Sequence, residues 1–377
     1  MRNAITALCM AVAALLLFGL VLVGTASSFQ SGGAVPFLKK QIIAAVVGLA
    51  MAVFCALSKH SIWRNRSLLP LLSGAVIVGT MLVFLWKPVN GSCRWIYLPG
   101  FSLQPSEFSR IVLLMALAAW YAGIGQRSRE FRRGVLIPLL IIAAFVAPII
   151  KAPDVGATMV MCVGAGAILL AAGVKWRWIL PGAFLMAGVV ALVLIFSPNR
   201  RARVMVFVDR IRGVPISEAT AAAAYHSEQS LEAFSRGGMR GRGIGGSIQK
   251  YRYLPEANSD FIFAIAAEEF GIAATVPMVL AYMVILLCGI YIAYHAPDRF
   301  SKFLSLGLTV MLTFEAAFNI GMTTGCLPTK GIALPFVSAG GSSLMASLAI
   351  IGILISIGAA SIEGPSTMRM KDAQIEY

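Results

Sequence analysis

Long apolar blocks separated by short polar segments dominate the chain. The blocks are continuous runs of Leu, Ile, Val, Ala and Met rather than alternations of apolar and polar residues. A membrane-spanning strand would alternate with a period of two, so each block predicts a membrane-spanning helix. About ten blocks are long enough to span a bilayer. They cover residues 5–27, 40–58, 67–86, 105–125, 134–151, 155–174, 178–197, 261–293, 303–324 and 342–361. The run 261–293 is long for one span, so we expect it to tilt or to begin outside the hydrocarbon.

Composition agrees with an all-α integral membrane protein. Of the 377 residues, 59% are hydrophobic and only 12% are charged, whereas a soluble domain carries about 25% charged residues. We expect residues 1–362 to form one polytopic membrane domain, a bundle of about ten transmembrane helices, and residues 363–377 to form a short cytoplasmic tail. The long polar segment 198–259 is predicted to be a large extracytoplasmic loop between the seventh and eighth spans. Within it, residues 216–235 have the composition of a surface helix.

Basic residues are distributed unequally between the two sides of the predicted bundle. The short segments on the side of the N-terminus hold most of them, and one such segment contains Arg127, Arg129, Arg132 and Arg133. Positive charge marks cytoplasmic loops, so both termini are predicted to lie in the cytoplasm. The same bias explains most of the net charge of +15, and no nucleic-acid partner is expected.

Four polar clusters interrupt the apolar pattern, and the span count puts all four on the outer side. They cover residues 90–110, 151–158, 235–260 and 319–344. Charge and irregular backbone at membrane depth are tolerated mainly around cavities and functional sites. The sequence therefore predicts one site that opens outward at the mouth of the helix bundle.

The first two clusters place charged residues close to predicted helix ends. Glu107 and Arg110 are three residues apart, so they share one helix face. They form either a structural ion pair or the charged floor of an outward cavity. Arg94 precedes a tryptophan, a pattern typical of an anchor at headgroup level. Asp154 precedes an apolar helix, where it either caps that helix or contacts a metal ion or the substrate.

The third cluster ends in the residue that we expect to carry the chemistry. Asp260 stands where a polar segment becomes an apolar helix, near the membrane boundary, and is our candidate general base. Glu268 and Glu269 follow deeper in that helix and are predicted to pair or pack. Upstream, Arg240 and Arg242 alternate with glycines in a literal G-x-G-x-x-G match that lacks the strand of a dinucleotide site. This stretch is either an anion site of backbone N–H and guanidinium groups or a flexible basic loop.

The fourth cluster breaks the apolar pattern with two prolines, several glycines and the hydroxyl groups of Ser338, Ser342 and Ser343. Such a segment is expected to be buried in protein or to line a cavity. Lys330 lies in the same segment, and it is either an exposed loop lysine or a ligand contact.

Four segments carry a family resemblance: RWIYLPGFSLQPSEFSR, APDVGAT, GRGIGGSIQKYRYLPEANSDFIFAIAAEEFG and NIGMTTGCLPTKGIALPFVSAGGSSL. With them the chain resembles the SEDS family of membrane glycan polymerases, typified by FtsW and RodA, over residues 10–361. The GGSIQK and YLPEA motifs are more similar to the division branch, FtsW. The chain departs from the family where Asn258 and Ser259 replace His-Thr, Ala152 replaces Glu or Gln, and His226 replaces Gln.

The resemblance implies an inverting glycosyltransferase that polymerises lipid II into glycan strands during cell division, with Asp260 as the base. Substrate contacts are then expected from Arg94, Glu107, Arg110, Asp154, Arg240, Arg242, Lys250, Glu256, Lys330, Ser338, Ser342 and Ser343. A divalent cation, Mg²⁺ or Mn²⁺, is expected with the pyrophosphate, and its protein ligands stay open. No organic cofactor is expected.

The resemblance also implies a location and partners. We expect a multi-pass protein of the cytoplasmic (inner) membrane with its active site on the outer face. The expected partners are lipid II, the growing glycan strand, a class B penicillin-binding protein, other divisome proteins and membrane lipids. The alternative is a flippase for lipid-linked oligosaccharides, which needs polar residues along a path across the bilayer; Glu315 is the main residue that fits such a path. An inactive divisome scaffold would leave the outer clusters unexplained.

Overall fold

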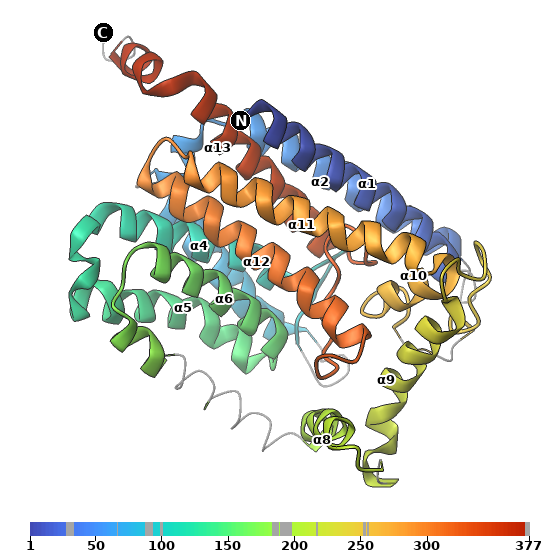
Figure 1. The fold of residues 1–377 in the computed structure, drawn as a ribbon. Helices are drawn as coiled ribbons and strands as arrows, with labels where there is room; N and C mark the ends of the chain where they lie inside the picture. The colour runs from blue at the N-terminus through green and yellow to red at the C-terminus, as the bar shows by residue number, and fades with distance from the viewer. Residues whose placement is uncertain are drawn as a thin grey trace.

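The computed structural model of the chain is a bundle of long helices with a smaller helical projection at one end (Figure 1). The structure describes residues 1–27, 34–65, 67–86, 93–98, 101–182, 188, 198–215, 218–251, 254 and 256–373. The helices are α1 (Arg2–Ala26), α2 (Ala34–Leu57), α3 (Leu68–Leu82), α4 (Pro105–Ile124), α5 (Ile137–Lys151), α6 (Val155–Ala171), α8 (Pro198–Arg212), α9 (Glu218–Gly237), α10 (Ile262–Phe270), α11 (Ile272–Tyr294), α12 (Arg299–Thr323) and α13 (Gly341–Ala373). Short helical turns form η1 (His60–Arg64), η2 (Val83–Leu85), η3 (Gly125–Arg129) and η4 (Arg132–Leu136), and strands β1 (Ile96–Leu98) and β2 (Phe101–Leu103) form an antiparallel hairpin.

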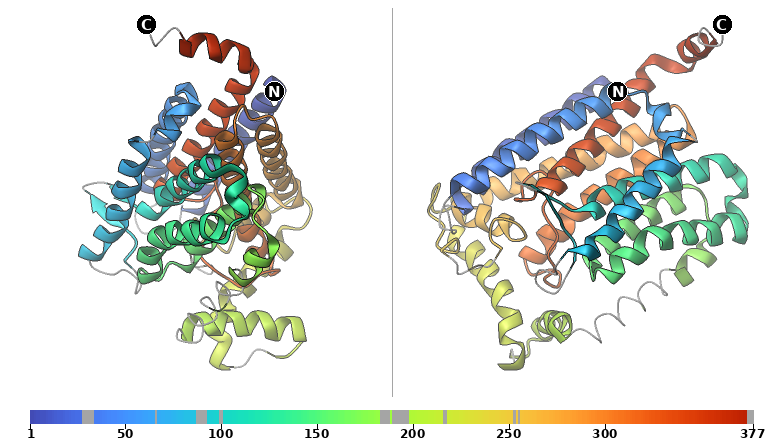
Figure 2. Two further views of the ribbon diagram at one scale, coloured as in Figure 1. Left: turned by 90° about the vertical axis from the view of Figure 1, so that its left-hand side faces the viewer. Right: turned by 180° about the vertical axis from the view of Figure 1, so that it is seen from behind.

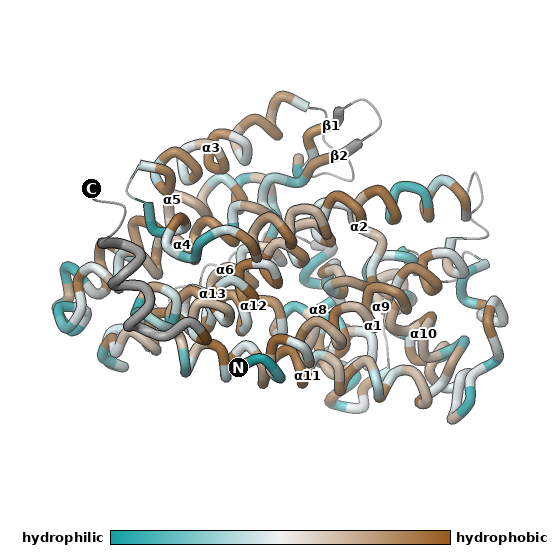
Figure 3. The backbone as a smooth tube through the Cα atoms, turned by 90° about the horizontal axis from the view of Figure 1, so that it is seen from above, coloured by the Kyte–Doolittle hydropathy of each residue, from teal (hydrophilic) through white to brown (hydrophobic). Residues whose placement is uncertain are grey.

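The described helices form a multi-pass membrane protein. Eight of them are long and apolar enough to cross a bilayer, and α6 is a shorter apolar helix of the same bundle. Large apolar side chains such as Leu17 and Leu280 are exposed on outward faces, and apolar colour runs along the helices in Figure 3. The predicted all-α membrane bundle is confirmed. The count of ten spans stays a prediction, because the seventh, 178–197, lies mostly outside the described residues. Helix α13 continues to Ala373, into the predicted tail 363–377.

The apolar run 261–293 is not one continuous helix but two, and only the second, α11, is long and apolar enough to cross a bilayer. Helices α10 and α11 meet at Gly271, where the chain turns with a φ of +68°. A side chain at this position would also press into the backbone of Met239 and Gly241. Gly271 is therefore required both by a left-handed backbone conformation and by the close approach of a neighbouring loop.

The glycine-rich loop after α9 caps this break. The backbone N–H groups of Arg242 and Gly243 donate to the carbonyl oxygens of Glu268 and Glu269, at 3.0 and 2.9 Å. These carbonyl groups end α10 and have no partners within it. The prediction that this loop offers its N–H groups to an anion is therefore wrong for these two groups, because α10 occupies them.

Helix α12 lies inside the bundle against α4, α6 and α11. Its side chains Leu304, Leu308 and Met311 are fully buried. On another side, α13 packs along α2 so closely that a Cβ at Gly352 would overlap the backbone of Ala52. Small residues at such crossings let helices approach in a membrane, where van der Waals packing drives association. This packing fixes the helix ends that carry the site.

We call the end of the bundle that carries Asp260 the Asp260 end. It gathers the starts of α4, α6 and α13, the end of α12, the hairpin, and residues 324–340. Helices α8 and α9 project from it in every view (Figures 1 and 2). Helix α9 confirms the helix predicted over 216–235, and its Ser230 donates to the carbonyl oxygen of Thr323 at 2.7 Å. That bond attaches the projection to α12.

Candidate active site

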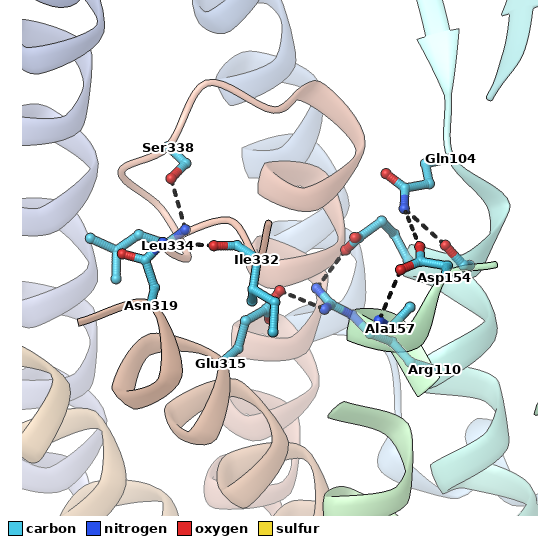
Figure 4. Close-up of polar contacts among 11 residues, drawn as sticks. Gln104, Arg110, Asp154, Ala157, Glu315, Asn319, Ile332, Leu334 and Ser338 are labelled. Carbon is cyan, nitrogen blue, oxygen red and sulfur yellow. Dashed lines mark hydrogen bonds and ion pairs between the residues drawn. The ribbon is translucent and has the colours of Figure 1, made fainter. Parts of the chain in front are cut away.

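Asp260 lies in a turn directly before α10, and long-range hydrogen bonds hold this turn. The amide of Asn319, fully buried in α12, donates to the carbonyl oxygen of Asp260 at 2.8 Å. It also donates to the carbonyl oxygen of Ile332 at 2.6 Å (Figure 4). The hydroxyl of Ser338 donates to the carbonyl oxygen of Ser259 at 2.6 Å. The position of the Asp260 backbone is thus set by α12 and by the segment that joins α12 to α13.

The Asp260 carboxylate lies against a stretch of backbone that has no side chain. Its Oδ2 is so close to Gly331 that a Cβ there would overlap it. The same stretch packs on α6, because a Cβ at Gly156 would lie 3.3 Å from Cε of Lys330 and 3.3 Å from Cγ1 of Ile332. The second, third and fourth sequence clusters therefore meet in one place, as predicted.

Asp154 caps α6 and joins the first cluster to the site. Its Oδ1 accepts from the N–H of Ala157 at 3.2 Å, which confirms the interpretation as a cap. Its Oδ2 lies 3.4 Å from Nε2 of Gln104 (Figure 4) and 3.7 Å from Nε of Arg94. Arg94 also donates to the carbonyl oxygen of Pro153 at 3.1 Å. These contacts hold Arg94 beside the start of α6.

Two arginines of α8 act on the residues around Asp154 and Asp260. Arg200 donates to the carbonyl oxygen of Pro153 at 2.9 Å, and the charge of Arg203 acts on Asp260. Sequence reasoning missed both because it treated 198–259 as a loop of low weight. The signal available was the run Asn-Arg-Arg-Ala-Arg directly after the seventh apolar block.

Positive charge concentrates around Lys330. Burial lowers the pKa of Lys330 to about 8, with Asp154 opposing the shift and Arg94, Arg200 and Arg203 adding to it. Burial and the neighbouring arginines also lower the pKa of Arg200. Cations that repel one another in this way are stabilised by an anion, and guanidinium forks match phosphate oxygens in particular.

The Asp260 carboxyl group binds a proton more tightly than an ordinary aspartate. Burial raises its pKa to about 6, and the charge of Glu256 adds to the rise, whereas Arg203, Arg94 and Lys330 oppose it. A carboxyl group with this pKa is mostly ionised at neutral pH, yet it is a stronger base than a free aspartate with a pKa of about 3.9. A general base is most effective when its pKa is close to the working pH.

A cavity of about 750 Å³ opens beside the Asp260 turn. It is lined by Phe37, Lys40, Gln41, Ile43, Trp95, Tyr97, Ser102, Glu256, Asn258, Ser259, Ala339, Gly340 and Gly341. These residues come from α2, the hairpin, the Asp260 turn and the start of α13. Ligand pockets measure about 300–1,000 Å³, so the cavity is large enough for a sugar-sized group. Residues just before Asp260 line it, but the Asp260 side chain does not.

A buried triad of charged residues lies deeper, between α4 and α12. Nη2 of Arg110 is 2.6 Å from Oε2 of Glu107, and its Nη1 is 2.8 Å from Oε1 of Glu315 (Figure 4). Ser343 hydrogen-bonds the Glu107 carboxylate. Glu107 and Arg110 therefore form the ion pair that their spacing predicts. Glu315 is the third member of this triad, and its side chain is buried.

Several other predicted contacts make bonds within the protein. The Ser342 hydroxyl accepts from the N–H of Gln104 at 3.0 Å and donates to the carbonyl oxygen of Ser102 at 3.2 Å, so it ties the hairpin to α13. Lys250 is buried and pairs with Glu269 at 3.2 Å. The charge of Lys250 is therefore already neutralised beneath the loop that carries it.

Three other residues of the third sequence cluster and the helix after it lie around α10: Arg240, Arg242 and Glu268. Arg240 and Arg242 are exposed on the loop that caps α10, and within the described residues no contact joins them to the Asp260 group. Glu268 accepts from the hydroxyl of Ser247 and from the N–H of Ile248 at 3.1 Å, which confirms its predicted pairing role. The cations near Asp260 are therefore Arg200 and Arg203 of α8, Arg94 just before the hairpin, and Lys330 between α12 and α13.

These features define a helical multi-pass membrane protein with one acid and several cations gathered at one end of its bundle. The family model of cell cycle proteins named for FtsW, RodA and SpoVE matches residues 6–362. The chain belongs to this family, as its motifs predicted.

Relatives of similar length support the division branch. A probable peptidoglycan glycosyltransferase FtsW of Trichlorobacter lovleyi is 36% identical over 363 residues, which cover 94% of this chain and 93% of that protein. The corresponding FtsW protein of Pseudomonas fluorescens is 34% identical over 91% of this chain and 85% of its own length.

Two solved structures share the fold. A chain of a peptidoglycan synthase complex, described for its structural coordination of polymerization and crosslinking, matches with a TM-score of 0.75 and 25% identity over 94% of this chain and 97% of its own. The rod shape determining protein RodA of Thermus thermophilus matches with a TM-score of 0.68 and 24% identity over 93% and 95%.

Proposed function

We propose that this chain is a peptidoglycan glycosyltransferase that polymerises lipid II into glycan strands during cell division, with Asp260 as its general base. One observation carries the proposal: a carboxylate of raised pKa is held against Gly331 and surrounded by the charges of Lys330, Arg94 and Arg203. The similarity to FtsW proteins over more than nine-tenths of the chain supports the choice of substrate.

The site suits a direct displacement with inversion. The 4-hydroxyl of the acceptor sugar attacks the anomeric carbon of the donor, and Asp260 takes the hydroxyl proton. The bond from that carbon to the pyrophosphate oxygen breaks, and the pyrophosphate leaves with the electron pair. Arg94, Arg200, Arg203 and Lys330 stabilise the charge that develops on it. A nucleophilic second carboxylate is needed only for retention.

A divalent cation fits this site as an ion shared with the substrate. The described part of the chain has no group of three or more His, Cys, Asp or Glu side chains that could hold a metal ion alone. Mg²⁺ usually binds through one or two carboxylates together with phosphate oxygens. Asp154, which lies beside Arg94 and takes no part in the proton transfer, is the carboxylate that would share Mg²⁺ or Mn²⁺ with the pyrophosphate oxygens, and the ion would neutralise pyrophosphate charge. The proposed displacement needs no organic cofactor.

Location and partners follow from the same reaction. Lipid-linked substrates require the inner membrane, and the basic short loops support cytoplasmic termini with the Asp260 end outside. The product is an uncrosslinked glycan strand, so a class B penicillin-binding protein is the partner that we propose to supply transpeptidation, within a divisome assembly. The similar chain from a synthase complex supports such a pairing.

The test supplies labelled lipid II and Mg²⁺ or Mn²⁺ to the purified protein, alone and with a class B penicillin-binding protein, and measures glycan polymer. Polymer formation is the expected result. A parallel assay in liposomes follows labelled lipid II across the bilayer. Transbilayer movement without polymer would favour the flippase instead. A flippase would need Glu315 as a polar residue on a path across the bilayer. The structure argues against this role, because Arg110 pairs with Glu315 at 2.8 Å.

The rate of polymerisation is expected to depend on the ionisation of Asp260. Below a pH of about 6, the pKa of this group, the base is protonated, and the rate should fall about tenfold per pH unit. Above it the rate should level off. Because the Glu256 charge raises the pKa, Glu256→Gln should move the midpoint to lower pH. A profile of kcat/KM against pH measures both, and an unmoved midpoint in this variant would contradict the assignment.

Replacing Gly331 with Ala is expected to lower polymerisation about 100-fold, the effect of a small misplacement of a reacting group. The new Cβ would overlap Oδ2 of Asp260, and the neighbouring backbone is held by Asn319, so the carboxylate must rotate away. Initial rates with lipid II measure the loss. Gly166→Ala in α6 is the matched control, because a Cβ there meets no atom within 4 Å. Equal rates in both variants would show that Asp260 tolerates displacement.

A further inference from the structure

A second large cavity, of about 880 Å³, lies at the other end of the bundle from Asp260. Helix α4 begins at the Asp260 end, and the cavity borders Gly123 near the opposite end of that helix. Its other walls are η1, the first turns of α3, and α5 at Ile141. We call this cavity the α3–α4 groove. It shares no lining residue with the cavity beside Asp260.

The deep wall of the α3–α4 groove is apolar. Trp120 lines it, and the indole N–H of this residue donates to the carbonyl oxygen of Arg133 at 2.9 Å, so the ring offers only carbon to the groove. Ala116 and Ala119 leave space along α4, and a Cβ at Gly123 would meet no atom within 4 Å. The apolar side of a space this large on a membrane bundle is suited to an acyl chain.

The rim of the groove carries hydrogen-bond donors and one cation. Arg64 lines it, is exposed, and has no carboxylate partner among the described residues. Asn65 also lines the groove, and because its Oδ1 accepts from the N–H of Ser67 at 2.9 Å, its Nδ2 group is the donor side of the amide. Ser61 adds a hydroxyl, and no Asp or Glu is present among the lining residues. Donors with a guanidinium and no acid select an anion, and phosphate in particular.

We propose that the α3–α4 groove binds one anionic glycerophospholipid of the bilayer, with its phosphate on Arg64 and an acyl chain along Trp120 and Ile141. Charge complementarity favours this occupant. The groove lies at the end of the bundle where basic residues gather, and basic pockets between membrane helices bind acidic headgroups. The site is separate from the reaction at Asp260 and does not depend on it.

Native mass spectrometry of the full chain, released from nanodiscs, tests the proposal. The discs contain phosphatidylglycerol and phosphatidylcholine with distinguishable acyl masses. One retained phosphatidylglycerol is expected on the wild-type chain. Arg64→Gln should weaken its retention about fivefold, the effect of one basic residue near an anionic surface. Gly123→Leu should also reduce retention, because its side chain would enter the groove from a position where a Cβ meets no atom within 4 Å.

Arg129→Gln is the matched control, because it removes one exposed charge in η3, close in sequence to Gly123 but outside the groove lining. It should retain the lipid as the wild type does. Equal losses in the Arg64 and Arg129 variants would reduce the effect to general surface charge and overturn the site. Equal retention of phosphatidylcholine would show an unselective boundary lipid, and an unchanged Gly123→Leu variant would place the lipid elsewhere. Either result overturns the proposal.

Discussion

Asp260→Asn is expected to reduce polymerisation of lipid II by about 100-fold to 10,000-fold, the usual contribution of a general base. The amide keeps the shape of the carboxylate and its place beside Gly331, but it cannot accept the hydroxyl proton. Substrate binding should change less than turnover, because Lys330 and the arginines that face the pyrophosphate remain. Steady-state assays with labelled lipid II separate kcat from KM. Polymerisation at the wild-type rate would remove Asp260 from the role of base.

The fold of this variant is expected to persist, and the reason lies in the raised pKa. A carboxyl group whose pKa is higher in the folded than in the unfolded chain destabilises the fold as it ionises. For Asp260 this loss sets in above its ordinary pKa and is complete above a pH of about 6. Asparagine carries no such charge, so the unfolding temperature at pH 7.5 should equal or exceed that of the wild type. Asp209→Asn makes the same change in α8. It is the control and should leave turnover intact.

Local patterns in the sequence predicted those site residues whose roles depend on their neighbours in the chain. Asp154 precedes an apolar helix and caps it. Glu107 and Arg110 are spaced for one helix face, and they pair. Asp260 could be singled out because a carboxylate at the start of an apolar segment is unusual in a membrane protein. The predicted bundle followed in the same way from block length and composition.

Contacts between distant segments could not be predicted from such patterns. Asn319 supports Asp260 across 59 residues of chain, and Arg200 reaches Pro153 from another helix. The loop around Arg242 was misinterpreted for the same reason, since the partners of its N–H groups lie at the end of α10. The break at Gly271 also lacks a local signal, because single glycines are common inside membrane helices.

Arg110→Met is expected to destabilise the protein by about 3–5 kcal/mol, the effect of breaking a buried ion pair by removing one partner. The guanidinium side chain is only 2% exposed and contacts both Glu107 and Glu315. Without it two largely buried carboxylates remain within the bundle, and no other described cation pairs with them. The thermal unfolding temperature in detergent and the yield of folded protein measure the loss.

The loss should come from stranded charge rather than from the missing arginine contacts, and two variants distinguish these causes. Removing both acids as well, in the triple variant Arg110→Met, Glu107→Gln, Glu315→Gln, should recover most of the stability, because an uncharged replacement of a buried ionic cluster is often close to neutral. Arg133→Met breaks an exposed pair with Glu130, whose side chains are 42% and 54% exposed, and should cost less than about 1 kcal/mol. If the triple variant were as unstable as Arg110→Met alone, the triad would hold α4 and α12 together by its specific bonds. The stability of this junction would then depend on the geometry of the three side chains, not on the balance of their charges.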